Sequence, residues 1–171
     1  GDPHASKFWR KSFATKGGEA EKSVDVESFV KAILKNLDIK DEDEFLTEQL
    51  FDVLSQSNEV SLQFFGLLIT LFGPFYKDKA LFMDLVELAS CDWFFNTCTK
   101  EEAQAFLDGK IDGTFLVRIS TNDPKKFPFT LSKRVTGKTV HARFETVEKK
   151  GVRSLAIKTK TKLVEAPSLV K

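Results

Sequence analysis

The first half of the chain carries hydrophobic side chains at the spacing of amphipathic α-helices. One stripe recurs at i, i+3, i+4, i+7, i+8 and i+11 and comprises Val26, Phe29, Val30, Ile33, Leu34 and Leu37. Because this spacing puts all of these side chains on one face, it predicts a helix. Comparable stripes predict helices over residues 45–54, 62–72 and 81–88, and a short first helix is expected around residues 8–13.

These helices form two helix–loop–helix pairs, and each loop has a valine directly before its second helix. Val24 and Val60 hold these positions, where paired EF-hands place the apolar residues of a short strand pair. A calcium-binding EF-hand loop needs an oxygen ligand at its first position and a glutamate at its twelfth. With Val60 in the usual apolar place, these positions fall on Val53 and Phe64. The sequence therefore predicts an EF-hand-like helical module without calcium or any other metal.

The second half combines one helix with short strands and is predicted to be a small α+β domain. Thr99 and Glu102 have the spacing of a capping box, which starts a helix that ends near residue 107. The inward face of this helix is expected to carry Ala103, Phe106 and Leu107. Strands are predicted over residues 115–119, 127–133 and 138–147.

Polar and charged side chains of these strands fall in phase on one face of the predicted sheet. Arg118 lies inside an apolar strand that has no acidic residue, and a charge in such a place needs a counter-ion. That counter-ion is either a distant carboxylate or a bound anionic ligand. The residues in phase with it are Ser120, Thr130, His141 and Arg143, and Lys100 joins them from the first turn of the helix. Such a cluster suits a doubly charged anion better than a carboxylate.

Composition indicates two folded modules of opposite charge. Hydrophobic residues make up 42% of the 171 residues and charged residues 30%, which excludes a disordered chain. Residues 1–90 contain 10 Lys and Arg against 16 Asp and Glu, a net charge of −6. Residues 91–171 contain 16 against 9, a net charge of +7. The basic half should therefore favour an anionic partner.

Targeting and redox signals are sparse in this sequence. Its longest apolar stretch is far shorter than the ~20 residues that a membrane-spanning helix needs, and no signal peptide is evident. The two cysteines, Cys91 and Cys98, are too few for a disulfide scaffold, so a reducing, cytoplasmic location is expected. The sequence does not begin with methionine, so residues 1–6 are interpreted as a possible cloning remnant.

Five motifs of the second half resemble the SH2 (Src homology 2) domain family in order and spacing. They are Trp93-Phe94-Phe95, Thr99-Lys100-Glu101-Glu102-Ala103, Gly113-Thr114-Phe115-Leu116-Val117-Arg118-Ile119-Ser120, Phe129-Thr130-Leu131-Ser132 and His141-Ala142-Arg143-Phe144. The resemblance implies a central antiparallel sheet flanked by two helices over residues 91–171. The second helix would begin at residues 166–171, where this sequence stops, so it is expected to be either truncated or lost.

The resemblance also implies that this domain binds phosphotyrosine, because SH2 domains use an arginine cluster to recognise phosphorylated motifs. Arg118 matches the strand arginine that holds the phosphate through two hydrogen bonds. Lys100 matches the basic helix position that packs on the phosphotyrosine. The phosphate-binding loop after the strand is matched by Ser120, Thr121 and Asn122.

Further positions of the phosphotyrosine pocket are matched on the next two strands. Thr130 matches a small residue that lines the pocket, His141 matches the family's histidine, and Arg143 matches the basic residue two positions later. Ile119 replaces an acidic residue that often follows this arginine, and this change should be tolerated. Ala142 replaces a frequent aromatic residue and leaves the floor for the residues after phosphotyrosine undefined. Because the second flanking helix is also expected to be incomplete, weak recognition of residues flanking the phosphotyrosine is expected.

The first half resembles the EF-hand module that precedes the SH2 domain in Cbl proteins, and less closely the helical linker of STAT proteins. The segments that carry the resemblance to Cbl lie at residues 8–13, 24–29 and 59–75. The expected organisation is the possible remnant at 1–6, an EF-hand-like helical module at 7–90 and an SH2 domain at 91–171, with an α+β fold overall.

Three functions remain open from the sequence alone. The favoured one is a monomeric phosphotyrosine-dependent binding module in signalling, with no cofactor and no nucleic-acid or membrane partner. The alternatives are a basic nucleic-acid-binding domain and the substrate-recognition part of a Cbl-like ubiquitin ligase, which would need further domains. An enzyme is not expected, because no nucleophile–base pair, paired carboxylates or glycine-rich phosphate loop is visible.

Overall fold

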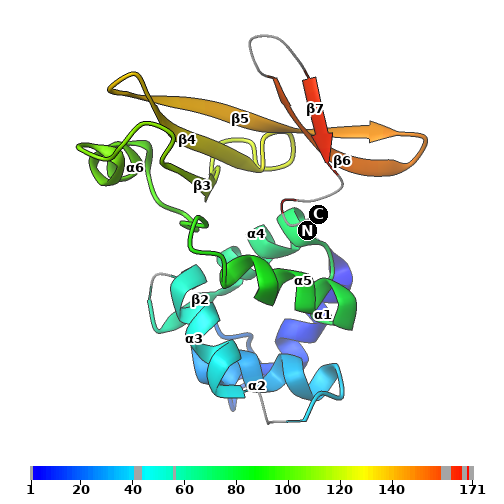
Figure 1. Cartoon of the computed structure of the whole chain (residues 1–171). Helices are drawn as coiled ribbons and strands as arrows, with labels where there is room; N and C mark the ends of the chain where they lie inside the picture. The colour runs from blue at the N-terminus through cyan, green and yellow to red at the C-terminus, as the bar shows by residue number, and fades with distance from the viewer. Residues whose placement is uncertain (1, 41–43, 56, 159–162, 167–168, 170–171) are drawn as a thin grey trace. The chain divides into compact units, whose positions relative to one another are not determined.

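The chain folds into two compact units, Gly1–Ala89 and Ser90–Lys171. The computed structural model describes residues 2–40, 44–55, 57–158, 163–166 and 169. The first unit consists mainly of helices and the second is built around a sheet (Figure 1). The predicted combination of helices followed by an antiparallel sheet is confirmed. None of the helices in the described segments is long and apolar enough to cross a membrane.

Helices α1 to α5 form the framework of the first unit. Their bounds are α1 Pro3–Ser12, α2 Val26–Asn36, α3 Glu44–Ser55, α4 Leu62–Phe72 and α5 Lys79–Ala89. Capping side chains explain where two of them begin. Asp25 accepts a hydrogen bond from the Ser28 N–H at 2.8 Å at the start of α2, and Ser61 accepts one from the Phe64 N–H at 3.0 Å at the start of α4. α4 ends at Gly73, whose φ of 75° glycine adopts without strain.

The first helix includes residues that the sequence marks as a possible cloning remnant. Pro3 begins α1, and the Asp2 carboxylate caps it by accepting a hydrogen bond from the His4 N–H at 2.9 Å. Ala5 is buried. Residues 3–6 therefore form the first turn of α1.

A two-stranded antiparallel sheet joins the two helix–loop–helix pairs. β1 (Ser23–Asp25) pairs with β2 (Glu59–Ser61), and Val24 lies directly opposite Val60. This is the strand pair predicted from the two valines, and it gives the unit the arrangement of paired EF-hands. In the second loop, the Ser57 hydroxyl donates a hydrogen bond to a backbone carbonyl at 3.1 Å. This hydroxyl thus supports the loop backbone, which is a structural role.

Aromatic rings dominate the core of the helical unit. The fully buried aromatic side chains include Trp9, Phe29, Phe51, Phe65, Phe75 and Phe82. The Phe29 ring centroid lies 5.2 Å from that of Phe51 and 5.6 Å from that of Phe65, both in edge-to-face geometry. The Trp9 indole N–H donates to the Glu21 carbonyl at 2.7 Å, so its polar atom is satisfied.

Helix α3 leaves three large apolar side chains exposed. Its buried side chains are Thr47, Leu50, Phe51 and Leu54, whereas Phe45, Leu46 and Val53 are exposed. The ring of Phe51 sets this orientation, because it packs against Phe29 and Phe82. The predicted helix is present, but only one of its two apolar faces is buried.

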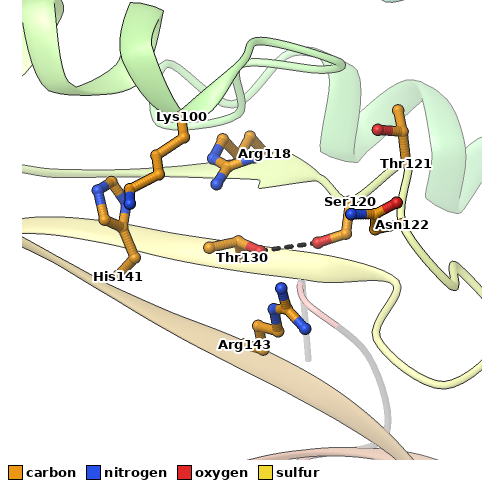
Figure 2. A pocket seen from close by; sticks show the side chains of 8 residues that line it. All are labelled: Lys100, Arg118, Ser120, Thr121, Asn122, Thr130, His141 and Arg143. Atoms are coloured by element: carbon orange, nitrogen blue, oxygen red, sulfur yellow. Dashed lines mark hydrogen bonds between the residues drawn. The ribbon is translucent and has the colours of Figure 1, made fainter.

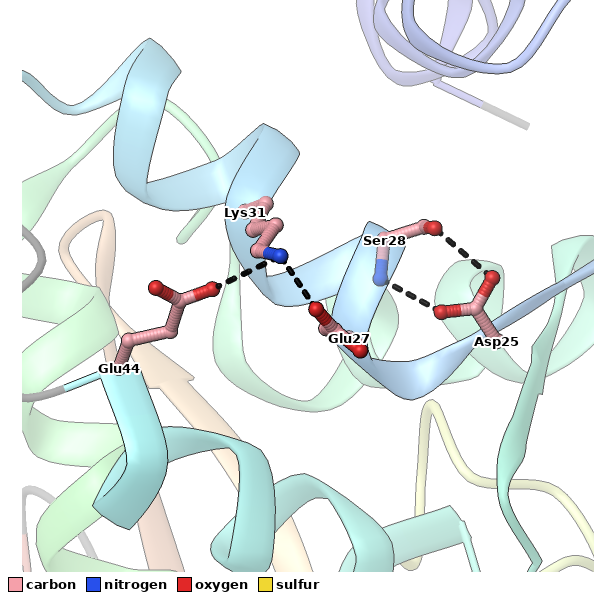
Figure 3. Close-up of polar contacts among 5 residues, drawn as sticks. All are labelled: Asp25, Glu27, Ser28, Lys31 and Glu44. Carbon is pink, nitrogen blue, oxygen red and sulfur yellow. Dashed lines mark hydrogen bonds and ion pairs between the residues drawn. The ribbon is translucent and has the colours of Figure 1, made fainter.

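Exposed ion pairs link α2 to the start of α3 (Figure 3). Lys31 of α2 contacts the carboxylate of Glu27 one turn earlier and lies 3.6 Å from that of Glu44 in α3. The hydrogen bond to Glu27 raises the pKa of Lys31. Because water and salt screen exposed pairs, these contacts contribute little to the stability of the unit.

The second unit is an antiparallel sheet with helix α6 (Lys100–Leu107) beside it. Its strands pair in chain order: β3 Phe115–Ile119, β4 Phe129–Val135, β5 Lys138–Lys149, β6 Val152–Lys158 and β7 Leu163–Ala166. The sequence predicts the first three, β3 with the observed bounds, but not β6 or β7. Ala166, where a second flanking helix was expected to begin, ends β7. The rest of that expected helix lies outside the described residues, apart from Leu169.

Helix α6 buries a narrower face than expected. A buried cluster next to the sheet consists of Cys98, Ala103, Leu107 and Leu116, with Phe95 packed against it. Phe106, which was predicted to point inward, is 44% exposed and packs against Phe95 with 4.6 Å between ring centroids. The small side chain of Ala103 and the position of Leu107 thus set how closely the helix approaches the sheet.

A tight turn joins β4 to β5. Thr136 and Gly137 have positive φ angles of 46° and 72°, as in the two-residue hairpin turns that match the twist of a sheet. The Asp112 carboxylate accepts a hydrogen bond from the Gly137 N–H at 3.0 Å. A side chain from the loop before β3 therefore supports this turn.

Replacing Phe29 by alanine tests the aromatic core. The side chain is fully buried, and removing such a ring costs ~3–5 kcal/mol. We expect Phe29→Ala to lower the free energy of unfolding of the helical unit by that amount in urea denaturation followed by circular dichroism. Phe45→Ala is the matched control, because that ring is 72% exposed, and it should change the free energy by less than ~0.5 kcal/mol. Equal effects of the two substitutions would contradict this description of the core.

Candidate functional site

Cross-strand pairing brings polar residues of β3, β4 and β5 onto one face of the sheet. Arg118 lies opposite Thr130, and Thr130 lies opposite Arg143. One row further along, Ser132 lies opposite His141. Directly opposed residues point to the same face of a sheet, so the strand register alone gathers these side chains.

Arg118 is held inside the sheet without an acidic partner in the described structure. Its neighbours Val117 and Ile119 are buried on the opposite face of β3. The Nε atom of Arg118 is itself buried and has no hydrogen-bond partner among the described residues. The ion pairs found in those residues do not include Arg118. Of the two counter-ions that the sequence leaves open, this arrangement favours a ligand over a distant carboxylate.

Two buried hydroxyl groups lie next to this arginine on the sheet. The Oγ of Ser120 and the Oγ1 of Thr130 are 2.7 Å apart, and these residues are only 7% and 3% exposed. The Ser120 N–H donates to the Pro128 carbonyl at 2.9 Å, which closes the base of the loop that follows β3. Thr121 and Asn122 lie exposed in that loop. The loop therefore starts from a fixed serine and presents polar side chains beside the arginine.

A buried serine orients His141. The Ser132 Oγ lies 2.8 Å from the His141 Nδ1, and Ser132 is fully buried. Burial lowers the pKa of His141 below its usual 6.5, and the positive charges of Arg118 and Lys100 lower it further, with Glu101 acting in the opposite direction. The imidazole is therefore uncharged at neutral pH.

The capping box at the start of α6 is formed as predicted. The Thr99 Oγ1 accepts a hydrogen bond from the Glu102 N–H at 3.1 Å, and the Glu102 carboxylate accepts one from the Thr99 N–H at 2.7 Å. The backbone hydrogen bond from Thr99 lowers the pKa of Glu102. Because this carboxylate already occupies the helix N-terminus, the site draws on the side chain of Lys100 rather than on the N-terminus itself.

These side chains surround one pocket, a cavity of about 510 Å³. Its lining consists of Lys100, Arg118, Ser120, Thr121, Asn122, Thr130, His141 and Arg143 (Figure 2). Arg118 and Arg143 extend from β3 and β5 toward the same space, with the Ser120–Thr130 hydrogen bond beside them (Figure 2). The lining contains no carboxylate, so the pocket is suited to an anion. The structure thus brings together all eight residues singled out from the sequence, and their roles in binding stay predictions.

Two residues outside that set belong to the surroundings of the pocket. Ser132, which orients His141, shares the strand phase of Thr130, and this phase is the signal that could have identified it. Phe127 places its ring 5.4 Å from the guanidinium carbon of Arg143, and no sequence pattern marks this contact. The described residues contain no group of three or more His, Cys, Asp or Glu that could hold a metal ion.

The C-terminal unit of this chain belongs to the SH2 domain family. The family model of the SH2 domain matches residues 93–171, which include α6, the sheet and the lining of the pocket. SH2 domains are non-catalytic modules that bind tyrosine-phosphorylated peptides. The chain as a whole is an EF-hand-like helical unit followed by an SH2 domain, as the sequence predicts.

Two kinases of Dictyostelium discoideum are similar to most of this chain. Dual specificity protein kinase shkE is 32% identical over 148 residues, which is 81% of this chain and 20% of that protein. Dual specificity protein kinase shkD is 27% identical over 164 residues, which is 91% of this chain and 22% of that protein. This chain thus spans about a fifth of their length, and the similarity extends over both of its units.

Other similarities are limited to part of the chain or to lower identity. Human suppressor of cytokine signaling 7 is 42% identical over 74 residues, which is 42% of this chain and 12% of that protein. The SH2 domain of the Monosiga brevicollis CRK/CRKL homolog crka1 is 28% identical, covers 41% of this chain and 62% of its own, and has a TM-score of 0.34. The TKB region of an inactive choanoflagellate E3 ubiquitin ligase Cbl is 19% identical, covers 84% of this chain and 42% of its own, and has a TM-score of 0.49.

The protonation of His141 is open to a direct test. We expect its titration midpoint, followed by NMR of the imidazole nitrogens, to lie below 6.5, because burial and two nearby cations oppose its charge. Since the folded-state pKa lies below the unfolded value, protonation favours unfolding. The stability that depends on neutral His141 is therefore complete above pH ~6.5 and is lost as the pH falls below it. His141→Gln identifies the signal, and a midpoint at or above 6.5 would contradict the description of the site.

Proposed function

We propose that the second unit recognises phosphotyrosine in partner proteins and that Arg118 binds the phosphate group. The observation that carries this proposal is a buried guanidinium nitrogen that has no hydrogen-bond partner among the described residues, in a pocket lined by none of their carboxylates. Burying an unpaired charge is costly, and an anionic ligand would offset that cost. A phosphate dianion can accept the two parallel hydrogen bonds that a guanidinium group offers.

The remaining lining residues would complete the phosphate site from three directions. The hydroxyl groups of Ser120 and Thr130 lie beside Arg118, and the loop that continues from Ser120 adds further polar groups. Lys100 supplies positive charge from α6 and Arg143 from β5 (Figure 2). Hydrogen bonds to charged groups contribute ~1.5–3 kcal/mol each, so a few of them suffice for selective binding of the phosphorylated form.

Weak recognition of the residues that flank the phosphotyrosine is part of this proposal. Ala142 presents only a methyl group on β5, where an aromatic ring is frequent in SH2 domains. The eight pocket residues are all polar or charged, so they suit the phosphate more than an apolar side chain of the peptide. Affinity would therefore come mainly from phosphotyrosine itself.

A nucleic-acid partner is the less favoured alternative. The net charge of +7 over residues 91–171 suits any polyanion. Nucleic-acid binding, however, relies on an extended basic groove with exposed aromatic rings, and it weakens steeply with salt. The cations described above converge instead on one confined pocket, which suits a single anionic group.

A second candidate places this region within a protein kinase. It is favoured by the extent of the similarity to shkE and shkD, which are named dual specificity protein kinases and match both units of this chain. In that case the phosphotyrosine pocket would direct a kinase to its targets. Determining the coding sequence on both sides of this region tests the idea: a kinase domain would support it, and a RING domain would favour a ubiquitin ligase instead.

The location proposed for this module is the cytoplasm. Neither Cys91, which is partly exposed, nor Cys98, which is buried, forms a disulfide in the described structure, which suits a reducing compartment. A module that reads phosphotyrosine would meet its partners there, and we propose that it does so as a monomer.

Removing the guanidinium of Arg118 tests the proposed function. We expect Arg118→Ala to weaken binding of a phosphotyrosine peptide by at least ~100-fold in calorimetry, because two charge-assisted hydrogen bonds of ~1.5–3 kcal/mol each are lost. The fold should persist, since Arg118 has no ion-pair partner in the described residues. Arg153→Ala on β6 is the matched control, because it removes the same charge from an exposed site outside the pocket. Unchanged affinity of the Arg118 variant, or equal losses in both variants, would refute the assignment.

The lysine of α6 should contribute less than Arg118. Lys100→Ala is expected to weaken phosphopeptide binding by roughly 5–20-fold, because a mobile ammonium group acts as a point charge without the fixed two-bond geometry of arginine. Lys110→Ala serves as control, since that ammonium lies 5.4 Å from the Phe106 ring centre and outside the pocket. If Lys100→Ala leaves the affinity unchanged in the same calorimetric assay, Lys100 has no part in the pocket.

A further inference from the structure

Arg143 is oriented by an aromatic ring. Its guanidinium carbon lies 5.4 Å from the centre of the Phe127 ring, and the ion pairs of the described residues do not include it. A cation at this distance is attracted by the negative face of the ring. This contact is therefore the one observed interaction, within the described residues, that restrains the charged end of Arg143.

The backbone around Phe127 is fixed on both sides. The Phe127 N–H donates to the Asp123 carbonyl at 2.9 Å, and the carbonyl of the residue before it accepts from the Thr146 N–H of β5 at 2.8 Å. The carbonyl of the residue after it accepts from the Ser120 N–H at 2.9 Å. These bonds tie the segment to β5 and to the end of β3, so the ring keeps its place relative to Arg143.

An aromatic ring orients a cation without neutralising it. A carboxylate in the same place would hold the guanidinium through its N–H groups and would compete with an anionic ligand for them. The face of a phenyl ring attracts the flat side of the group and leaves the N–H edges free. Lys126, whose ammonium lies 5.0 Å from the same ring centre, adds a second positive charge beside it.

We propose that Phe127 is a positioning residue of the phosphotyrosine pocket, whose ring holds Arg143 ready to bind the phosphate as a second arginine. This inference rests on the function proposed above and adds a residue to it. A long arginine side chain loses conformational freedom when it binds, and a side chain that is already held loses less. Phe127 would thus raise affinity without touching the ligand.

A double-mutant cycle separates this role from a merely structural one. We expect Phe127→Leu, which keeps an apolar side chain, to weaken binding of a phosphotyrosine peptide by roughly 3–10-fold when Arg143 is present. In the Arg143→Gln background the same change should alter the affinity by less than about 1.5-fold. Phe127→Tyr keeps the ring and should retain the affinity of the unaltered chain.

A matched control exists on α6. Phe106 also lies 5.4 Å from a cation, Lys110, but that pair is outside the pocket, so Phe106→Leu should leave the affinity unchanged.

NMR of the unaltered chain without peptide adds a measurement that needs no variant. The NMR signals of the Arg143 side-chain protons should be shifted upfield by the ring current of Phe127. If these signals appear at ordinary arginine chemical shifts, the proposal is overturned.

The outcomes distinguish the two levels of the argument. If the unaltered chain fails to bind the phosphotyrosine peptide, the proposed function falls and this inference falls with it. If the unaltered chain binds the peptide but Phe127→Leu has the same effect in both backgrounds, the inference is overturned and the proposed function stands. A loss seen only when Arg143 is present, together with retention in Phe127→Tyr, supports both.

Discussion

A positive charge held within a β-sheet without a compensating carboxylate is the constraint on which the second unit depends. β3 buries Val117 and Ile119 on one face and turns Arg118 to the other, so burial of the apolar side chains fixes where the guanidinium lies. Its neighbours across the sheet offer hydroxyl dipoles rather than negative charge. Burying this charge costs free energy of folding, which the packing of the rest of the sheet must offset. A bound anion would recover part of that cost.

Further positive charge converges on the same pocket, and its arrangement limits repulsion. Lys100 comes from the exposed start of α6, where the Glu102 carboxylate lies in the same turn. Arg143 rests against an aromatic ring. His141 stays uncharged at neutral pH, because burial and the two nearest cations lower its pKa. The site thus keeps a strong attraction for a dianion while one of its titratable groups remains neutral.

Sequence periodicity and motif spacing predict most of this architecture. The bounds of β3 and the capping of α6 depend on local signals, and both are observed. The pairing of the strands around Val24 and Val60 follows from the placement of both valines in the EF-hand pattern, and it is observed as well. Arg118, Thr130, His141 and Arg143 reach one face of the sheet through strand phase and register, which is why their gathering could be predicted. The buried face of α3, by contrast, depends on which ring meets Phe51 in three dimensions. The contact of Phe127 with Arg143 is of the same kind, because a loop residue and a strand residue meet only after folding.

The hairpin between β4 and β5 links the pocket to a distant part of the unit. Thr136 and Gly137 turn the chain, and Asp112 supports the turn with a hydrogen bond of 3.0 Å. A slip of one residue between neighbouring strands moves every side chain of the slipped strand to the other face. Such a slip would separate Arg143 from Arg118 without altering either residue. A bend that contributes no side chain to the pocket lining therefore helps to decide whether the two arginines share one face of the sheet.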